Sequence, residues 1–203
     1  STVRTYVDLN EKDGGEITGM AEPVEGVPVV FKFRKTLKLV PTGRVEAPYQ
    51  TKMIGPRIGC IHHRSIVSAT DADGQATVVW ASHKGFYEYS GGVVVRISRD
   101  IDDIWYGLNE YVGAGFNLNA TLMPVHGVFY SDREQLWYHL ATGSGDSPGL
   151  RVVLSTRFNV GRDQFGKRGG WSVHSGKSAK AMCAVMFSDS LGDVMSKTLR
   201  PYV

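Results

Sequence analysis

The sequence predicts an all-β protein of the β-propeller type, with about three and a half blades of short antiparallel strands. The chain alternates short runs of β-branched and aromatic residues with glycine-rich turns. Related runs recur at intervals of roughly 50 to 60 residues, the period of a several-stranded repeat. With 24 glycines and 8 prolines in 203 residues, the chain has many turns. Four-stranded units repeated in this way bury their faces against their neighbours, as propeller blades do.

The clearest run spans residues 78–92, which read as two strands joined by the polar turn 82–85 and closed by two glycines. A related run lies 49 positions earlier, over residues 29–43. The two runs share like residues at six positions, which pair as Val29 with Val78, Val30 with Val79, Phe31 with Trp80, Lys35 with Lys84, Leu37 with Phe86 and Gly43 with Gly92. The same unit therefore occurs at least twice.

A second recurring element is an apolar run that ends in Ser or Thr followed by Asp. It occurs over residues 66–71, 127–132 and 184–189, and its Asp71, Asp132 and Asp189 are separated by 61 and 57 residues. Another strand-like run follows each time, over residues 77–80, 135–140 and 193–196. The repeats predict one β-propeller-like domain, or part of one, with units at approximately 14–57, 58–110, 118–175 and 178–203.

In chain order, the loose alternation of residues 1–10 predicts an edge strand or an entry segment, and a turn over 11–16 precedes the first unit. Residues 41–56 lack a clear pattern and are expected to be irregular. The second unit ends with a strand over 93–97. Residues 99–108 then predict a short amphipathic helix, because Ser98 can cap it, acidic residues fill its first turn and apolar residues recur at helical spacing.

The third unit is expected to hold strands over 121–126, 127–130, 136–140 and 150–158, with a hairpin loop at 142–149. A glycine-rich loop over 161–170 precedes Trp171, and a fourth unit begins at 181–187. A formal charge of +3 is too small to indicate nucleic-acid binding by itself. The two cysteines lie in apolar settings typical of buried thiols, and no apolar run is long enough to span a membrane. No signal peptide is visible.

The candidate metal-binding and catalytic side chains are better explained by structural roles. His62 and His63 are adjacent, and on a strand they would point to opposite faces, so only one of them could face any given metal site. Residues 71–74 open like a calcium loop but lack its later acidic ligands. His126, His139 and His174 have no recognisable nucleophile motif beside them. We therefore predict no catalytic residue, no cofactor and no metal, and we expect the aspartates of the Ser-Asp turns to bond backbone amides.

The tryptophans Trp80, Trp137 and Trp171 recur at repeat positions with nearby tyrosines. Such aromatic residues can form a sugar-stacking surface, but their periodic placement favours packing between blades. The residues expected to carry the repeat are Phe31, Gly43, Asp71, Trp80, Gly85, Tyr89, Gly92, Asp132, Trp137, Trp171 and Asp189.

The order of these motifs resembles the repeat pattern of virion propellers of short-tailed phages, the tail nozzle or tail tubular protein B-like family. The resemblance covers roughly residues 14 to 175 and is carried by residues 15–20, 29–32, 58–60, 82–92, 135–138, 151–154 and 171–172. It implies that the glycine–aromatic element at 85–91 is an outer hairpin and that Trp171-Ser172 closes a blade. The chain is shorter than those proteins, so closing a ring requires more chain or another copy.

The resemblance implies a structural, non-enzymatic subunit of a phage tail nozzle or tube through which the genome passes. Its implied partners are copies of itself and other tail or portal proteins, with transient contact to genomic DNA, and its location is the virion tail after synthesis in the host cytoplasm. One alternative is a propeller that binds or hydrolyses glycans, as sialidases do, although the sequence shows no pair of convergent carboxyl groups. A second alternative is a kelch or WD-type protein-interaction module.

Overall fold

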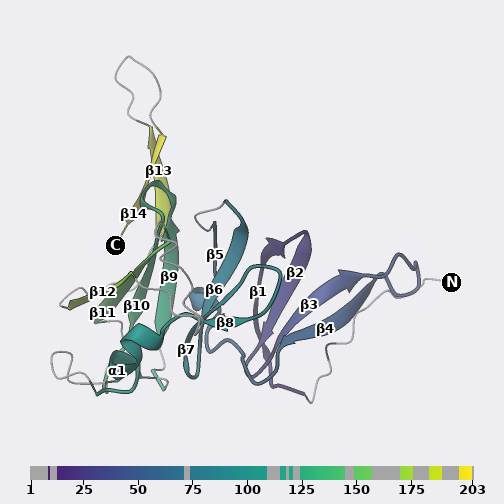
Figure 1. Ribbon diagram of the computed structural model, residues 1–203, viewed down its shortest axis with the longest axis horizontal. Coiled ribbons are helices and arrows are strands. Elements are labelled where there is room, and N and C mark those ends of the chain that lie inside the picture. The colour runs from purple at the N-terminus through teal and green to yellow at the C-terminus, as the bar shows by residue number, and fades with distance from the viewer. Residues whose placement is uncertain are drawn as a thin grey trace.

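The computed structural model describes residues 9, 13–70, 74–108, 115–117, 119–120, 124–144, 149–156, 170–175, 183–188 and 197–202. These residues form three four-stranded antiparallel sheets, a two-stranded sheet and one short α-helix (Figure 1). The prediction of an all-β chain with one short helix is therefore confirmed. Within each four-stranded sheet the strands follow the order of the sequence, so every sheet is an up-and-down meander.

The first sheet consists of β1 (Ile17–Val24), β2 (Val27–Lys32), β3 (Thr36–Pro41) and β4 (Tyr49–Gly55). A two-residue turn joins β1 to β2, and its residues Glu25 and Gly26 have positive φ angles of 54° and 75°, as tight hairpins require. The expectation that residues 41–56 are irregular is wrong, because β4 pairs with β3 along its whole length. Polar residues such as Gln50 and Lys52 interrupt the apolar pattern of this largely exposed strand, so the sequence did not predict it.

The second sheet consists of β5 (Val67–Thr70), β6 (Ala76–Ser82), β7 (Gly85–Tyr89) and β8 (Val95–Arg96). The two strands predicted within residues 78–92 are confirmed as β6 and β7, which pair from Val78 opposite Tyr89 to Ser82 opposite Gly85. The 49-residue offset places β2 on β6 and the start of β3 on β7. The repeat therefore matches second strand with second strand and third with third.

The third sheet consists of β9 (Val125–Tyr130), β10 (Gln135–Leu140), β11 (Leu150–Ser155) and β12 (Trp171–Ser175). The two-stranded sheet consists of β13 (Cys183–Ser188) and β14 (Lys197–Tyr202). The apolar runs that end in Ser or Thr and Asp correspond to β5, β9 and β13, the first strands of three successive sheets. The strand-like run expected at 193–196 lies outside the described residues.

The helical segment lies between the second and third sheets in the sequence. A 3₁₀ turn, Arg99–Ile101, runs into α1 (Asp102–Trp105), so the helix ends before residue 108, where it was expected to end. Two further 3₁₀ turns span His63–Ser65 and Ser131–Arg133. Ile101, Ile104 and Trp105 are buried, and the segment covers one end of the contact between the second and third sheets.

The second sheet is buried on both faces. On β6, Val78 and Trp80 pack toward the first sheet, whereas Val79 and Ala81 pack toward the third, and none of the four is exposed. Alternate side chains of a strand point to opposite faces, so a strand covered on both sides needs an unbroken apolar run. The run from residue 78 to 81 therefore identifies the central layer of the molecule.

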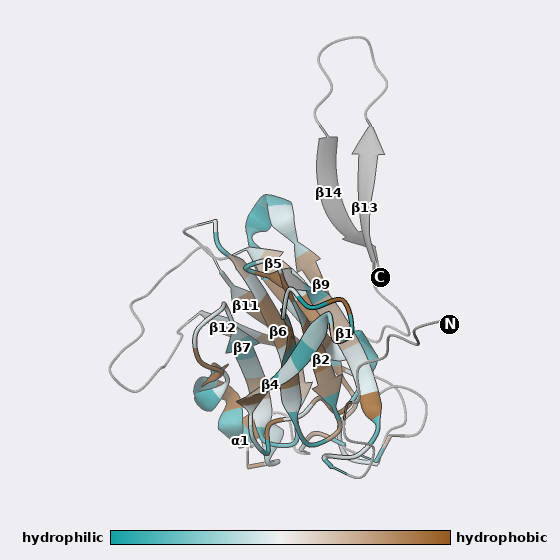
Figure 2. Cartoon of the chain, turned by 90° about the vertical axis from the view of Figure 1, so that its right-hand side faces the viewer, coloured by the Kyte–Doolittle hydropathy of each residue, from teal (hydrophilic) through white to brown (hydrophobic). Residues whose placement is uncertain are grey.

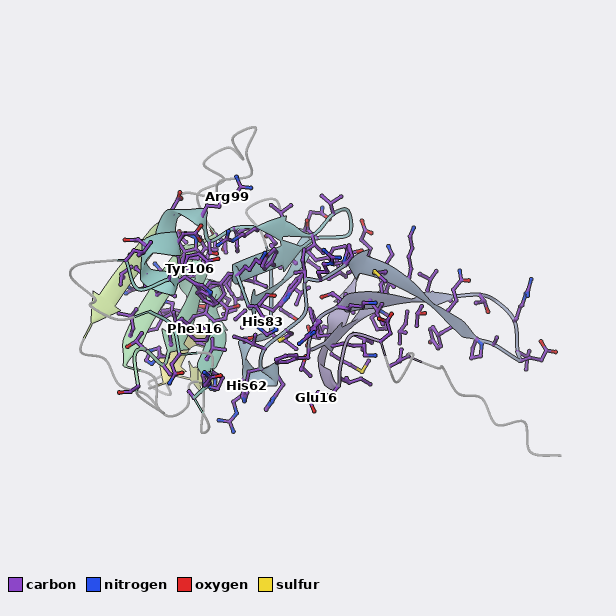
Figure 3. All side chains as sticks on the ribbon, turned by 90° about the horizontal axis from the view of Figure 1, so that it is seen from below. Glu16, His62, His83, Arg99, Tyr106 and Phe116 are labelled. Carbon is purple, nitrogen blue, oxygen red and sulfur yellow. The ribbon has the colours of Figure 1, made fainter. Side chains whose placement is uncertain are left out.

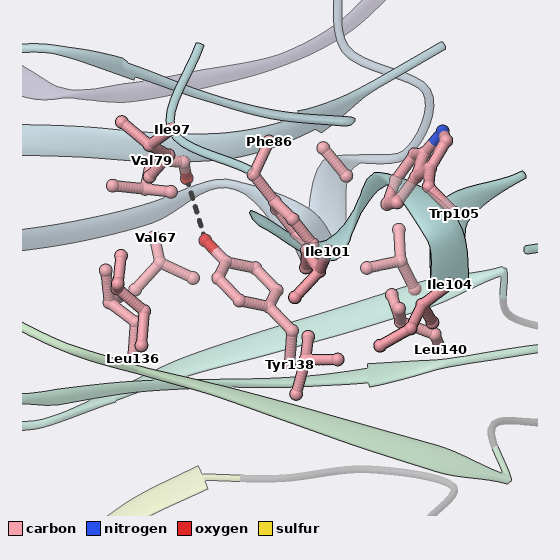
Figure 4. Packing of buried hydrophobic residues seen from close by; sticks show 14 of the residues in the cluster. Val67, Val79, Phe86, Ile97, Ile101, Ile104, Trp105, Leu136, Tyr138 and Leu140 are labelled. Atoms are coloured by element: carbon pink, nitrogen blue, oxygen red, sulfur yellow. Dashed lines mark hydrogen bonds between the residues drawn. The ribbon is translucent and has the colours of Figure 1, made fainter. Parts of the chain in front are cut away.

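The contact between the second and third sheets centres on Phe86 and Tyr138 (Figure 4). Their ring centroids are 4.4 Å apart, and Phe86 also meets Trp105 edge to face at 5.3 Å. The Tyr138 hydroxyl donates a hydrogen bond to the carbonyl oxygen of Val79 at 3.1 Å, which satisfies it inside an apolar core. This bond ties β10 directly to β6.

The sheets converge along their first strands. β1 contacts β5, β5 contacts β9, and β9 contacts both β13 and β14. The three large sheets diverge from these first strands, so that β4 and β12 lie far apart at opposite ends of the molecule (Figure 1). The arrangement leaves the outer face of the first sheet, which points away from the second, without a neighbouring sheet in the described part of the chain.

Candidate functional site

Three of the predicted repeat residues meet between the first and second sheets. Phe31 on β2 and Trp80 on β6 are fully buried, with ring centroids 4.9 Å apart. The Trp80 indole N–H donates to the carbonyl oxygen of Gly59 at 3.1 Å. Tyr89 is 2% exposed, and its hydroxyl donates to the carbonyl oxygen of Gly91 at 3.0 Å. These aromatic residues hold two sheets together and offer no surface for a ligand.

The predicted glycines have different physical roles. Gly85 has a φ of +123°, and a Cβ there would lie 2.1 Å from the Ser98 hydroxyl oxygen. Gly43 has a φ of +73° but has open space around it, in the connection between β3 and β4. Gly92 has neither a positive φ nor a close neighbour. Of the three, only Gly85 is required both by backbone conformation and by space.

The remaining predicted residues do not come together. Trp171 stacks on Phe86 at 5.3 Å and donates from its indole N–H to the carbonyl oxygen of Ile97 at 2.8 Å, so it links the last strand of the third sheet to the second sheet. Trp137 lies on the opposite face of the third sheet, half-buried, and Asp132 is exposed in a 3₁₀ turn. Asp71 and Asp189 lie outside the described residues.

The positions of His62 and His63 differ from the sequence-based expectation of a strand. They do not lie on a strand: His62 caps a 3₁₀ turn, and the two rings lie together with centroids 4.4 Å apart. Burial, followed by the neighbouring His63 and Arg64, lowers the pKa of His62 from 6.5 to about 4. Figure 3 shows His62 between the first and third sheets. No group of three His, Cys, Asp or Glu side chains suited to a metal ion occurs within the described ranges.

The thiol of Cys60 is buried beneath the same turn. It donates to the carbonyl oxygen of His62 at 3.1 Å and lies 3.4 Å from the Ser65 hydroxyl oxygen. Burial raises the pKa of this thiol, so the nucleophilic thiolate is disfavoured. The surroundings of Cys60 therefore suit packing and not catalysis.

The surface that stands out is the outer face of the first sheet, which we call the open face. The strand register places its residues on one side: Ile17 lies opposite Lys32, Met20 opposite Val30, Leu37 opposite Met53, and Pro41 opposite Tyr49. Four of its large apolar side chains are exposed, namely Met20 at 59%, Ile17 at 52%, Met53 at 45% and Tyr49 at 43%. Figure 2 views the molecule from the side of this sheet.

The open face has one polar corner. Lys32 is only 2% exposed, and its ammonium group donates to the carbonyl oxygens of Leu9, at 3.0 Å, and of Asp13. Asp13 also forms an ion pair with Lys35. A hollow of about 170 Å³ lies beside this corner, lined in part by Leu37, Thr51 and Met53. The face therefore combines an apolar stripe with a fixed charged rim, a composition typical of association surfaces.

Sequence reasoning missed the open face. Its signal lies in β4, where Tyr49, Thr51 and Met53 share one side while Gln50 and Lys52 share the other. In β1, by contrast, register shifts after Ile17 and after Ala21 disrupt the alternation, so Ile17 and Met20 come to the same side without the usual spacing. The β4 part of this pattern could be read from the sequence, whereas the β1 part depends on β-bulges.

Comparison with known proteins adds no assignment. No protein-family model matches this chain, and a search of curated proteins finds no significant match. Across the residues that the structure describes, none of the helices is long and apolar enough to cross a membrane.

Proposed function

We propose that the three four-stranded sheets are successive blades of a β-propeller-like arrangement and that β13 and β14 begin a fourth. Three features support this: the meander order of each sheet, the packing of sheet on sheet, and the contacts among first strands. In such an arrangement first strands line the axis and fourth strands lie at the rim. Three and a half blades leave a ring open, so completion requires further blades from another chain or another part of the same chain.

We infer that the chain is a structural, non-enzymatic subunit of an oligomeric assembly. The observation that carries this inference is the open face, because four of its large apolar side chains are exposed, although Val30 and Leu37 between them are buried. A contiguous apolar face of this kind favours association with a matching surface. A head-to-tail contact between copies would extend the series of sheets, and closure of that series would make a ring.

The more specific role, a subunit of a phage tail nozzle or tube through which the genome passes, rests on the motif resemblance described above. The open face supports the oligomeric part of that role. The sugar-stacking alternative gains no support from Trp80, which is fully buried, or from Trp171, which stacks on Phe86 against the core. The partners proposed are further copies of this chain and other virion proteins.

The association is tested by sedimentation velocity over a range of protein concentrations. We expect the wild-type chain to sediment as species larger than a monomer, and we expect Met20→Lys combined with Met53→Lys to shift it to monomer, because burying two ammonium groups in an apolar contact is strongly unfavourable. Leu108→Lys is the matched control, since Leu108 is 75% exposed but lies away from the open face. A wild-type chain that remains monomeric at every concentration contradicts the proposal.

The propeller arrangement and the axial role are tested by electron microscopy of assemblies that contain this chain. A symmetric ring with the sheets radiating from a central channel is the expected class average. An isolated particle without rotational symmetry would argue against the axial role and would redirect attention to the receptor-binding or glycan-binding alternatives.

A further inference from the structure

A row of basic side chains crosses the third sheet on the face turned away from the second sheet. The sheet of β13 and β14 contacts β9 at one end of the row, whereas Arg151 is half-buried and His174 is exposed toward the other end. The register pairs His126 on β9 with His139 on β10, His139 with Arg151 on β11, and Arg151 with His174 on β12. The neighbouring residues Tyr138, Leu140 and Val152 point into the core against the second sheet. Because alternate side chains of a strand face opposite sides, the basic row lies on the side away from that core.

The guanidinium group of Arg151 is held in one position. Its Nε–H donates to Nε2 of His139 at 2.7 Å, and its central carbon lies 4.5 Å from the centroid of the Trp137 ring. His139 is fully buried, and the Trp137 indole N–H donates to the side-chain oxygen of Gln135 at 3.0 Å, so both supports are themselves fixed. A guanidinium oriented in this way loses little freedom when it binds an anion.

No acidic partner of Arg151 occurs in the part of the chain that the structure describes; its contacts there are His139 and Trp137. The local potential is positive, since Arg151 and His126 both add to the effect of burial in lowering the pKa of His139. Burial also lowers the pKa of the half-buried Arg151 itself. A desolvated cation among imidazoles gains from a bound anion.

We propose that Arg151, supported by Trp137 and His139 and flanked by His174, binds a single carboxylate group from an acidic side chain of a partner protein. Only one donor of the guanidinium is used by His139, and the remaining N–H groups form the planar fork that matches two carboxylate oxygens. One fixed positive charge suits a monoanion better than a phosphate. A sugar acid fits less well, because the Arg151 guanidinium already covers a face of the Trp137 ring.

The test uses nuclear magnetic resonance of the isotopically labelled full-length chain at pH 7 and constant ionic strength, with N-acetyl-glutamate N-methylamide as the probe. We expect saturable shifts of the Arg151 Nε–H and His174 ring resonances, with a dissociation constant in the millimolar range. Arg151→Lys keeps the charge but loses the planar fork, and it is expected to weaken binding about tenfold or more. Assignment of the shifting resonances in the wild-type chain shows whether the probe binds at Arg151, even if a variant folds poorly.

Arg133→Lys is the matched control. Arg133 lies in the 3₁₀ turn between β9 and β10 of the same sheet, with its guanidinium carbon 5.8 Å from the Tyr130 ring centroid, but it is exposed. Its replacement is expected to leave the titration unchanged. The proposal is overturned if no saturable shift occurs, if the control weakens binding as much as Arg151→Lys, or if inorganic phosphate or glucuronate binds more tightly than the peptide-like probe. None of these outcomes depends on whether the chain associates through its open face.

Discussion

At the scale of single residues, Gly85 is the position where sequence and structure agree most closely. The glycine was expected from its place in the repeat, and its φ of +123° together with the contact to Ser98 explains why no other residue fits. The Ser98 hydroxyl oxygen accepts from the backbone N–H of Phe86 at 2.9 Å, so it cannot move away without breaking a buried hydrogen bond. A Cβ atom at Gly85 would thus disturb both β7 and the segment that holds Ser98.

Gly85→Ala is expected to destabilise the chain by about 2–4 kcal/mol, because backbone strain and steric overlap add. Gly92→Ala is the matched control: it lies in open space without a positive φ, and its effect is expected to stay within about 0.5 kcal/mol. Urea unfolding followed by circular dichroism measures both. Equal effects at the two positions would show that the Ser98 contact does not constrain the hairpin.

His139 makes stability depend on pH. Burial, then Arg151 and His126, lower the pKa of this imidazole from 6.5 to about 4, and its Nε2 accepts a hydrogen bond only while unprotonated. The unfolded chain binds the proton first as the pH falls, so the stabilisation is complete above pH 6.5 and is lost between pH 6.5 and 4. The loss amounts to about 3 kcal/mol, at 1.36 kcal/mol per pKa unit.

The measurement compares urea unfolding of the wild-type chain with His139→Gln at several pH values in this window. Glutamine keeps an acceptor for Arg151 but does not titrate, so the variant is expected to lose less stability on acidification. His62 has a similarly lowered pKa and contributes in both proteins, which is why the difference between them is the informative quantity. Identical pH profiles would contradict a neutral His139.

At the scale of elements, the sequence predicted strands well where both of their faces are buried and poorly where one is exposed. The run of apolar residues in β6 identified a central strand, whereas β4 was read as irregular because the polar residues Gln50, Thr51 and Lys52 interrupt its apolar ones. The helix was predicted in place but too long: a 3₁₀ turn forms its first part, and α1 ends at Trp105. The basic row and the β1 part of the open face could not be read from the sequence, because both depend on strand register.

The two faces of the first sheet are expected to respond differently to truncation. Phe31→Ala removes a fully buried ring that contacts Trp80 and is expected to cost about 3–5 kcal/mol. Met20→Ala, on the same sheet but on the open face, is expected to cost less than about 1 kcal/mol in the monomer. Denaturant unfolding at low protein concentration distinguishes the two, and similar losses would mean that the open face is covered in the isolated chain.

At the scale of the whole molecule, the second sheet couples the other two. Its two faces belong to two separate core clusters, so neither the first nor the third sheet can leave without exposing one side of it. We therefore expect the three large sheets to unfold in a single cooperative transition, with tryptophan fluorescence and far-ultraviolet circular dichroism giving the same midpoint. Two separated transitions would show that the clusters are independent.

The order of the sheets along the chain also bears on how the protein forms during synthesis. Every four-stranded sheet is built from consecutive residues, so the strands of the first can pair before those of the second have left the ribosome. Phe31 and Val29, however, gain their cover only when β6 arrives with Trp80, about fifty residues later. The nascent first sheet therefore presents both of its apolar faces to the surroundings until β6 has been synthesised.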